Sequence, residues 1–161
     1  MSDGITIGTG DRAPEFDLAE THERRVRLSD YHGRSNVLLV FHPYAFTPVC
    51  AEEAMDLQEN LESFRAANTE VVFVSCDTSA ARQAWRAQLG VEYTFASDFW
   101  HHGAAARAYG VFDDEAGTAR RGTFLIDLEG IVIWSLVNEI DTRRDELGRS
   151  SLGALGDGST D

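Results

Sequence analysis

"FHPYAFTPVC", residues 41–50, joins two different sequence patterns and decides how this chain folds. Before it, Val37–Phe41 is a continuous apolar run, which is typical of a strand buried on both faces of a sheet. After it, apolar residues recur at steps of four and three from Cys50 to Phe64, which predicts a helix over about Pro48–Ala67. The stretch therefore connects a buried strand to an amphipathic helix.

The flanking segments extend this unit into an α/β domain. A second apolar run, Val71–Ser75, and a second predicted helix, Ser79–Leu89, follow, and strand–helix–strand order of this kind implies a right-handed parallel crossover. Two short strands, Phe16–Leu18 and Arg25–Leu28, form a hairpin before it. Four further predictions are a short strand within residues 94–98, a helix over His102–Tyr109, a hairpin of Gly122–Asp127 with Ile131–Val137, and a helix over about Thr142–Leu155. We expect a central mixed β-sheet flanked by helices on both faces, with an N-terminal hairpin extension.

Length and composition favour one domain, 1–161, with a flexible tail at 156–161. Apolar residues make up 43% of the chain, which is enough for a sizeable core. No apolar run approaches the roughly 20 residues that span a bilayer. The N-terminus lacks the basic and apolar regions of a signal peptide, so we expect a cytoplasmic protein.

Charge and cysteine content narrow the function classes. The net charge of −13 argues against nucleic acid or an anionic membrane as a partner, because both repel an acidic surface. All 14 basic residues are arginine, so a cation in a site must be an arginine or a histidine. The two cysteines cannot form a four-cysteine zinc site, and no histidine lies at ligand spacing from either, so we expect no metal.

The predicted start of the first long helix gives Cys50 an unusual position. Thr47 is a favourable N-cap residue and Pro48 falls at the first helical position, so Cys50 is the third residue of the helix. Free backbone amides and the positive end of the helix dipole favour a thiolate there. This local pattern predicts a nucleophile, although a cysteine that only fills core space fits the position equally well.

The spacing Pro43-x-x-x-Thr47-x-x-Cys50 resembles the active-site signature of the peroxiredoxins, which are thiol peroxidases with a thioredoxin-like fold. Other segments are similar to the same family: "GDRAPEFDL" at 10–18, "VVFVSCD" at 71–77, "SDFWHHGAAARAYGVF" at 97–112 and "RRGTFLID" at 120–127. The last two resemble the one-cysteine peroxiredoxins of the alkyl hydroperoxide reductase E type. The resemblance runs from about Gly10 to Val137.

This resemblance implies a role for each matching residue. Cys50 corresponds to the peroxidatic cysteine, and Thr47 to the threonine whose hydroxyl holds the peroxide and the sulfur. Pro43 corresponds to the proline that packs over the thiolate and limits water access. Arg121 corresponds to the arginine beside the sulfur, and Glu53 to a glutamate that orients this arginine. A guanidinium stays protonated at working pH, so it suits a thiolate partner.

Each of these residues also has a simpler interpretation. Thr47 can be only a helix cap, Pro43 only a strand terminator, and Glu53 one more acid on a solvated helix face. Arg120 and Arg121 are adjacent at a strand start, and either side chain can point inward, although the resemblance selects Arg121.

The aromatic and histidine residues nearby are assigned less directly. We expect His42 to line the substrate pocket without transferring a proton, the alternative being a hydrogen-bonded histidine at a strand end. Phe46 is expected to line the pocket or a dimer contact. His101 and His102 are expected to be exposed or structural.

The resemblance also implies the reaction and its partners. Hydrogen peroxide, organic hydroperoxides or peroxynitrite would oxidise Cys50 to a sulfenic acid without metal or organic cofactor. Cys76 lies on the same predicted sheet edge, so a disulfide with Cys50 is conceivable, but its position does not match the family's resolving cysteines. We therefore expect an external thiol, thioredoxin or glutaredoxin-like protein to recycle Cys50. A homodimer or higher homo-oligomer is also implied. The rival interpretation is a redox sensor or holdase that uses the same sulfur.

Overall fold

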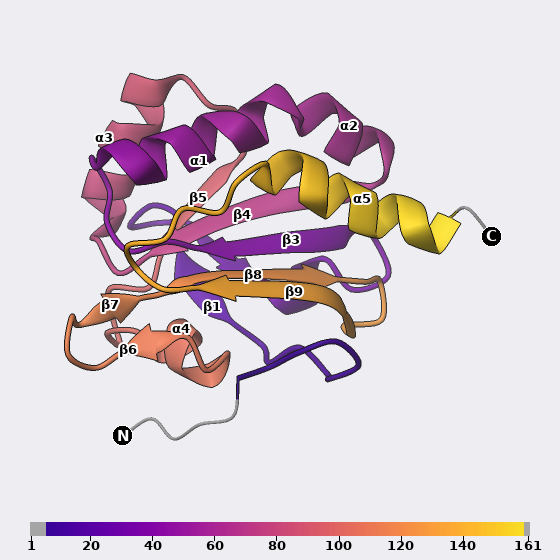
Figure 1. Ribbon diagram of the computed structural model, residues 1–161. Coiled ribbons are helices and arrows are strands. Elements are labelled where there is room, and N and C mark those ends of the chain that lie inside the picture. The colour runs from indigo at the N-terminus through magenta and orange to yellow at the C-terminus, as the bar shows by residue number, and fades with distance from the viewer. Residues whose placement is uncertain (1–5, 160–161) are drawn as a thin grey trace.

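The computed structural model describes residues 6–159 and is built on one large sheet (Figure 1). The sheet has seven strands in the order β2-β1-β5-β4-β3-β8-β9. The strands are β1 (Asp17–Ala19), β2 (Arg25–Arg27), β3 (Asn36–Phe41), β4 (Thr69–Ser75), β5 (Thr94–Ser97), β8 (Arg121–Ile126) and β9 (Val132–Asn138). β3 pairs with β4 in parallel and with β8 antiparallel, so the sheet is mixed.

The helices and a small hairpin surround this sheet. The helices are α1 (Pro48–Glu59), α2 (Leu61–Ala66), α3 (Ser79–Leu89), α4 (Ala104–Ala108), α5 (Leu147–Ser159) and the 3-10 turn η1 (Leu28–Asp30). The hairpin pairs β6 (Phe112–Asp113) with β7 (Thr118–Ala119). Of the helices within residues 6–159, none is both long and apolar enough to cross a membrane.

Side chains along the central strands point alternately to the two faces of the sheet, so the core consists of two clusters. Leu38 and Val40 of β3 face the cluster covered by α1, α2, α3 and α5. Leu39 and Phe41 face the opposite cluster, which α4 and the N-terminal segment cover. Figure 1 shows the four helices on one side of the sheet and α4 with β6–β7 on the other. The predicted mixed sheet with helices on both faces is confirmed.

The N-terminal hairpin is part of this sheet. β1 pairs with β2 and also with β5 through Ala19 and Ser97. The predicted hairpin extension therefore lengthens the sheet at the β5 side.

Two predicted elements differ from the structure, and one element was not predicted. The helix predicted over Pro48–Ala67 is two helices, because Asn60, at φ −107° and ψ 9°, interrupts it. The last helix begins at Leu147 and not at Thr142, because the residues between fold into a loop whose Arg144 is directed inward. The β6–β7 hairpin was not predicted, since two-residue strands leave no periodic signal. The tail predicted for 156–161 partly lies outside the described residues, and its flexibility stays a prediction.

The β3–α1 junction is the element that positions the site. β3 ends at Phe41, and the chain continues through His42, whose amide still donates to Val74 O at 2.9 Å. Thr47 has the extended conformation of an N-cap, with φ −112° and ψ 151°, and Pro48 opens α1. The strand-to-helix connection and the helix start predicted from residues 41–50 are therefore confirmed.

Candidate active site

Cys50 occupies the third position of α1 and is fully buried. Its side chain packs in the core cluster on the helix-rich face of the sheet, with Val40 of β3 and Ala54 of α1. The helix start that was predicted to favour a thiolate is thus present in the structure. The polar groups that contact the sulfur determine whether it can act as a nucleophile.

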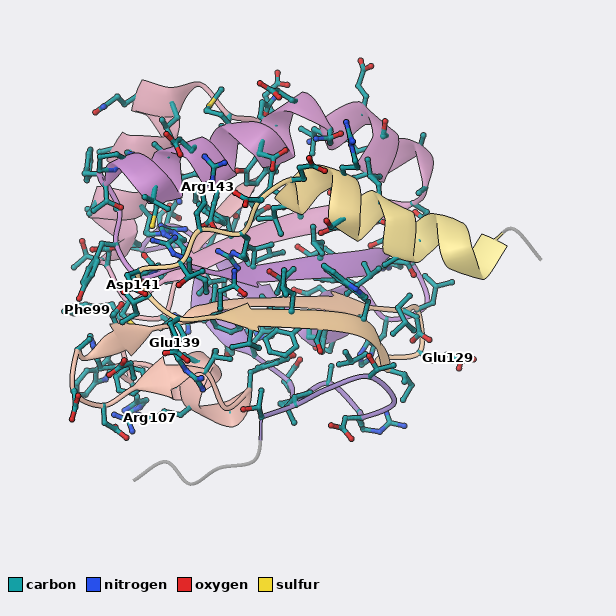
Figure 2. The ribbon with its side chains drawn as sticks, viewed as in Figure 1. Phe99, Arg107, Glu129, Glu139, Asp141 and Arg143 are labelled. Atoms are coloured by element: carbon teal, nitrogen blue, oxygen red, sulfur yellow. The ribbon has the colours of Figure 1, made fainter. Side chains whose placement is uncertain are left out.

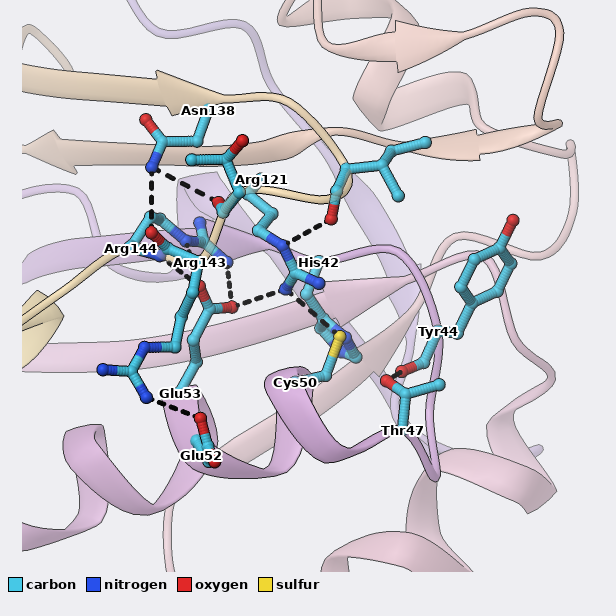
Figure 3. Close-up of polar contacts among 12 residues, drawn as sticks. His42, Tyr44, Thr47, Cys50, Glu52, Glu53, Arg121, Asn138, Arg143 and Arg144 are labelled. Atoms are coloured by element: carbon cyan, nitrogen blue, oxygen red, sulfur yellow. Dashed lines mark hydrogen bonds and ion pairs between the residues drawn. The ribbon is translucent and has the colours of Figure 1, made fainter.

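Arg121, the first residue of β8, supplies a cation beside the sulfur. Its Nη1 lies 3.3 Å from Cys50 Sγ and donates to Glu53 Oε1 at 2.8 Å (Figure 3). Its Nε donates to Ile140 O at 2.8 Å. The guanidinium is only 4% exposed, so these contacts fix it beside the sulfur with little competition from water.

Glu53 lies one turn after Cys50 on α1 and is shared by two arginines. Besides accepting from Arg121, its carboxylate accepts from Arg144 Nη2 at 2.7 Å, Arg144 Nε at 3.0 Å and the Arg144 amide at 2.9 Å. Arg144 Nη1 donates onward to Gly122 O and Thr123 Oγ1 of β8. One carboxylate therefore joins α1, β8 and the loop before α5.

The loop between β9 and α5 completes this network. Figure 2 shows Glu139, Asp141 and Arg143 along this loop, and all three side chains are exposed. Arg144, between these exposed residues and α5, is buried at 1% exposure. Ile140 contributes its carbonyl to Arg121. The loop thus contributes Arg144 itself to the site and holds Arg121 through the Ile140 carbonyl.

The electrostatics favour an ionised Glu53. Burial alone raises the pKa of this carboxyl, but hydrogen bonds from Arg144 and the charges of Arg144 and Arg121 outweigh burial, so the net pKa is lowered. The result is a buried triad of two cations and one anion. The positive charge that Glu53 does not neutralise lies beside the Cys50 sulfur.

Pro43 and Thr47 lie within the connection between β3 and α1. The Thr47 hydroxyl donates to Tyr44 O at 2.9 Å, and it accepts no hydrogen bond from the α1 amides. Thr47 is therefore an N-cap by position but not by side-chain bonding. Among the described residues, no hydrogen bond joins it to Cys50. Pro43 is buried, and its carbonyl accepts from Thr118 Oγ1 at 2.6 Å.

His42 and Phe46 differ sharply in exposure. His42 is fully buried, its ring stacks on Phe73 with centroids 4.0 Å apart, and its Nε2 lies 2.6 Å from Arg82 Nη1. Phe46 is 52% exposed and adopts the left-handed conformation with φ 64°. His42 thus lies in the interior, whereas Phe46 lies at the surface of the β3–α1 junction.

The remaining candidates lie away from the sulfur. Arg120, the alternative to Arg121, donates to Gly110 O at 2.6 Å and is directed to a different part of the structure. His101 and His102 are exposed, and His102 Nε2 lies 2.8 Å from Gly117 O.

Cys76 is separated from Cys50 by the sheet. Both are free thiols, but Cys76 packs in the core cluster on the α4 face, whereas Cys50 packs in the cluster on the α1 face. Burial, together with the nearby charges of Asp98 and Asp77, raises the pKa of Cys76 to about 12. Cys76 therefore stays protonated at neutral pH and is a poor nucleophile.

Sequence reasoning missed Arg144 and Arg82. Arg144 follows Arg143 in a polar loop, 91 residues from the carboxylate that it binds, so no spacing rule connects them. Arg82 lies on a predicted helix among other polar residues, where a charge is normally solvated. In retrospect, the apolar face of α3 gave one signal, because Arg82 falls one turn before Trp85 on the buried side.

No metal site is evident in the described part of the chain, where no three His, Cys, Asp or Glu side chains are placed to hold an ion.

Comparisons with known proteins point to one family. The AhpC/TSA family model matches residues 9–135. Alkyl hydroperoxide reductase E of Mycobacterium tuberculosis is 37% identical over 150 residues, which cover 92% of this chain and 98% of the relative. The reduced 2-Cys peroxiredoxin of Plasmodium vivax is similar in structure, with a TM-score of 0.80 and 30% identity over 94% of this chain and 83% of that chain. The peroxidoxin BcpB of Mycobacterium tuberculosis has a TM-score of 0.84 and 26% identity over 94% of this chain and 97% of that chain.

Proposed function

The chain belongs to the AhpC/TSA family and is a thiol-dependent peroxidase, and on this premise we propose that Cys50 is the sulfur that attacks the peroxide. One contact carries this proposal: Arg121 Nη1 lies 3.3 Å from Cys50 Sγ and is held there by Glu53. A buried, fixed guanidinium favours the thiolate, which is the nucleophilic form of cysteine.

The reaction is an oxygen transfer to sulfur. The Cys50 thiolate attacks the terminal oxygen of R–O–O–H, so that an S–O bond forms while the O–O bond breaks. The sulfur is oxidised to a sulfenic acid, and the departing alkoxide or hydroxide takes a proton to become an alcohol or water. Arg121 and the Cys50 amide are the donors that stabilise the negative charge on the departing oxygen.

Thr47 and Pro43 shape the approach of the peroxide. The hydroxyl of Thr47 is already anchored by donating to Tyr44 O, which leaves its oxygen free to accept a hydrogen bond from the O–H of the peroxide. Pro43 is assigned the role of limiting water access to the sulfur, and it is buried with its carbonyl bound by Thr118. His42 is fully buried and is assigned to the interior side of the substrate pocket, and the half-exposed Phe46 is assigned to its rim.

An external thiol restores Cys50. A thiol attacks the sulfenic sulfur to give a mixed disulfide and water, and a second thiol displaces Cys50 by exchange. Cys76 is protonated and lies on the opposite face of the sheet, which supports a one-cysteine cycle. The reductant is a low-molecular-weight thiol, a thioredoxin or a glutaredoxin-like protein.

Hydrogen peroxide, organic hydroperoxides and peroxynitrite are the proposed oxidants. The half-exposed aromatic rim, with Tyr44 at 42% and Phe46 at 52% exposure, suits organic substituents on the peroxide. The same rim is the proposed contact of a homodimer, because large exposed aromatic side chains are enriched in interfaces. A cytoplasmic location is part of the proposal.

Stopped-flow oxidation of the reduced protein tests this function. Wild type and Cys76→Ser are expected to react rapidly with one equivalent of hydroperoxide and to turn over with an external thiol, whereas Cys50→Ser loses the fast phase. Loss of recycling in Cys76→Ser overturns the one-cysteine cycle. A single oxidation without steady-state turnover identifies a sensor or holdase. An alkylation rate at Cys50 with its midpoint near that of a free thiol, about pH 8.5, identifies an inert cysteine.

A further inference from the structure

Arg82 of α3 is a buried arginine without a carboxylate partner among the described residues. It is 0% exposed, and all three of its nitrogens are engaged inside the core. Nη2 donates to Phe73 O at 2.7 Å and Nε donates to Ala96 O at 3.1 Å. Nη1 lies 2.6 Å from His42 Nε2. Two backbone carbonyls therefore fix the guanidinium, and its remaining nitrogen is aimed at one imidazole nitrogen.

This contact determines where His42 carries its proton. A guanidinium has donors and no acceptor, so the nitrogen that it approaches at 2.6 Å must accept the hydrogen bond. His42 Nε2 is therefore unprotonated, and the single proton of the neutral ring lies on Nδ1. Burial lowers the pKa of His42 well below its usual value, and the charges of Arg82, Arg144 and Arg121 lower it further. An interaction with the backbone of Tyr44 acts in the opposite direction, but it falls short of hydrogen-bond geometry and does not outweigh the other effects, so the ring is neutral.

Arg82 itself remains charged. Burial lowers the pKa of Arg82 to about 10, and the charges of Asp77, Tyr93 and Cys50 act in the opposite direction. At neutral pH the side chain is still a cation. A positive charge in this position also favours a thiolate at Cys50, which packs in the same cluster as Phe73 and Trp85, the two rings beside His42.

His42 Nδ1 is the one buried side-chain nitrogen or oxygen in the described chain that has no hydrogen-bond partner. Leaving such a group unpaired in the core is unfavourable, so it calls for an explanation, and a role in catalysis is one of those known for native proteins. His42 directly follows β3 at the end of the strand that leads to Cys50, and its ring stacks on Phe73, which packs in the same core cluster as Cys50.

We propose that Arg82 is a positioning residue of the peroxidase site, which fixes His42 as a neutral imidazole protonated on Nδ1 and so reserves that N–H for the oxygen that Cys50 acquires. The proposal rests on the function proposed above, because the oxygen comes from the hydroperoxide. It assigns the site a donor from β3 that is separate from Arg121 and from the backbone amides.

The tautomer is tested first in the reduced wild-type protein, without peroxide. Long-range ¹H–¹⁵N correlation spectra of histidine-labelled protein are expected to show His42 as the Nδ1–H tautomer, with no titration through neutral pH. An Nε2–H tautomer, or an imidazolium that forms near the ordinary histidine pKa of about 6.5, overturns the assignment. This result is independent of peroxidase activity, so it separates a failure of the inference from a failure of the proposed function.

Oxidation tests the reserved donor. After one equivalent of hydroperoxide, the Nδ1 proton resonance of His42 is expected to move downfield as it gains an oxygen acceptor. If Cys50 is oxidised to the sulfenic acid, as verified by mass spectrometry, and this resonance does not move, the reserved donor is refuted.

Variants of α3 test the role of Arg82. Arg82→Met is expected to convert the His42 tautomer to a mixture and to lower the second-order rate constant with hydroperoxide about tenfold, equivalent to about 1.4 kcal/mol. Arg82→Lys, which keeps a charged donor, is expected to restore most of that rate.

Arg86→Met is the matched control, because Arg86 lies one turn further on α3 and donates to Tyr93 O without reaching His42. An equal loss of rate in Arg82→Met and Arg86→Met, at equal thermal stability, reduces Arg82 to a structural role. If Arg82→Met does not fold, the wild-type spectra still decide the tautomer.

Discussion

At the scale of single residues, the site depends on one carboxylate that serves two arginines. The sequence predicted that Glu53 orients Arg121, and the structure brings Glu53, Arg121 and Cys50 together. The stronger contacts of Glu53 are those with Arg144, which no sequence pattern indicated. Glu53 could be predicted because helix geometry fixes it one turn after Cys50, and Arg121 because the family resemblance assigns it. Arg144 depends on a long-range loop, and such contacts leave no local signal.

Glu53→Gln is expected to destabilise the protein by about 3–5 kcal/mol, because it leaves two buried guanidinium groups without their anion. The rate of Cys50 oxidation is also expected to fall, since Arg121 loses the contact that holds it. Urea denaturation and stopped-flow kinetics measure the two effects. Glu52→Gln is the control, because Glu52 pairs with Arg143 at the surface and its loss should change stability little. Equal stability of the two variants would contradict the buried triad.

The lowered pKa of Glu53 predicts how stability varies with acidity. The folded-state pKa lies below the unfolded value of about 4.3, so the contribution of Glu53 is complete above that pH and is lost as pH falls through the folded pKa. The difference in free energy of unfolding between wild type and Glu53→Gln is therefore expected to stay constant above about pH 4.3 and to shrink below it. Denaturation curves at a series of pH values measure the difference. A gap that widens in acid contradicts the assignment.

Thiol labelling should separate the two cysteines. Both thiols are buried, so their protonation and not their exposure distinguishes them. Because the pKa of Cys76 is raised to about 12, Cys76 is expected to resist iodoacetamide at neutral pH. Intact-mass spectrometry should find one adduct on the native wild type, none on native Cys50→Ser, and two on the wild type in denaturant. Labelling of native Cys50→Ser at neutral pH would show that Cys76 is accessible and reactive.

At the scale of elements, the sequence predicted the strand–helix units well and their ends poorly. The start of α1 was predicted because Thr47 and Pro48 are local signals, and the structure begins the helix at Pro48. The start of α5 was misplaced, because Arg144 gains more from the buried Glu53 than from a helical turn. A tertiary contact of this kind overrides local helix propensity.

The packing of α5 against α1 predicts opposite effects for two glycines. A Cβ on Gly148 would lie 3.0 Å from Asp56 O and would overlap the Asn60 side chain, whereas nothing lies within 4 Å of a Cβ on Gly153. Gly148→Ala is expected to cost about 1–3 kcal/mol of stability. Gly153→Ala is expected to stabilise the exposed helix interior by about 0.5–1 kcal/mol. Thermal denaturation measures both. Stabilisation by Gly148→Ala would mean that α5 does not pack this closely on α1.

At the scale of the whole molecule, the surface carries a strong acidic charge and a few exposed aromatic side chains. The net charge is −13, and Phe46, Phe99 and Trp100 are at least 45% exposed. An acidic surface disfavours non-specific association between copies. The exposed aromatic side chains are therefore the candidate sites for a specific contact between subunits.

Phe46→Glu is expected to convert the proposed homodimer to a monomer, because it places a charge on the rim that would be buried between subunits. Ile133→Glu is the matched control, since Ile133 is 40% exposed on the edge strand β9, away from the β3–α1 junction. Light scattering coupled to size-exclusion chromatography gives the mass of each variant. A monomer for Ile133→Glu and a dimer for Phe46→Glu would move the interface to the sheet edge.

The loop that carries Ile140 and Arg144 has a consequence for how the enzyme is made. The motif from Pro43 to Cys50 is synthesised well before this loop, yet the two arginine contacts of the loop complete the site. A nascent chain that stops after β9 carries the whole signature, but Glu53 has only Arg121 of its two arginine partners and Arg121 lacks the Ile140 carbonyl. Such a chain is expected to lack peroxidase activity, so the newly made polypeptide becomes an active peroxidase only after this loop has been synthesised and has folded onto the site.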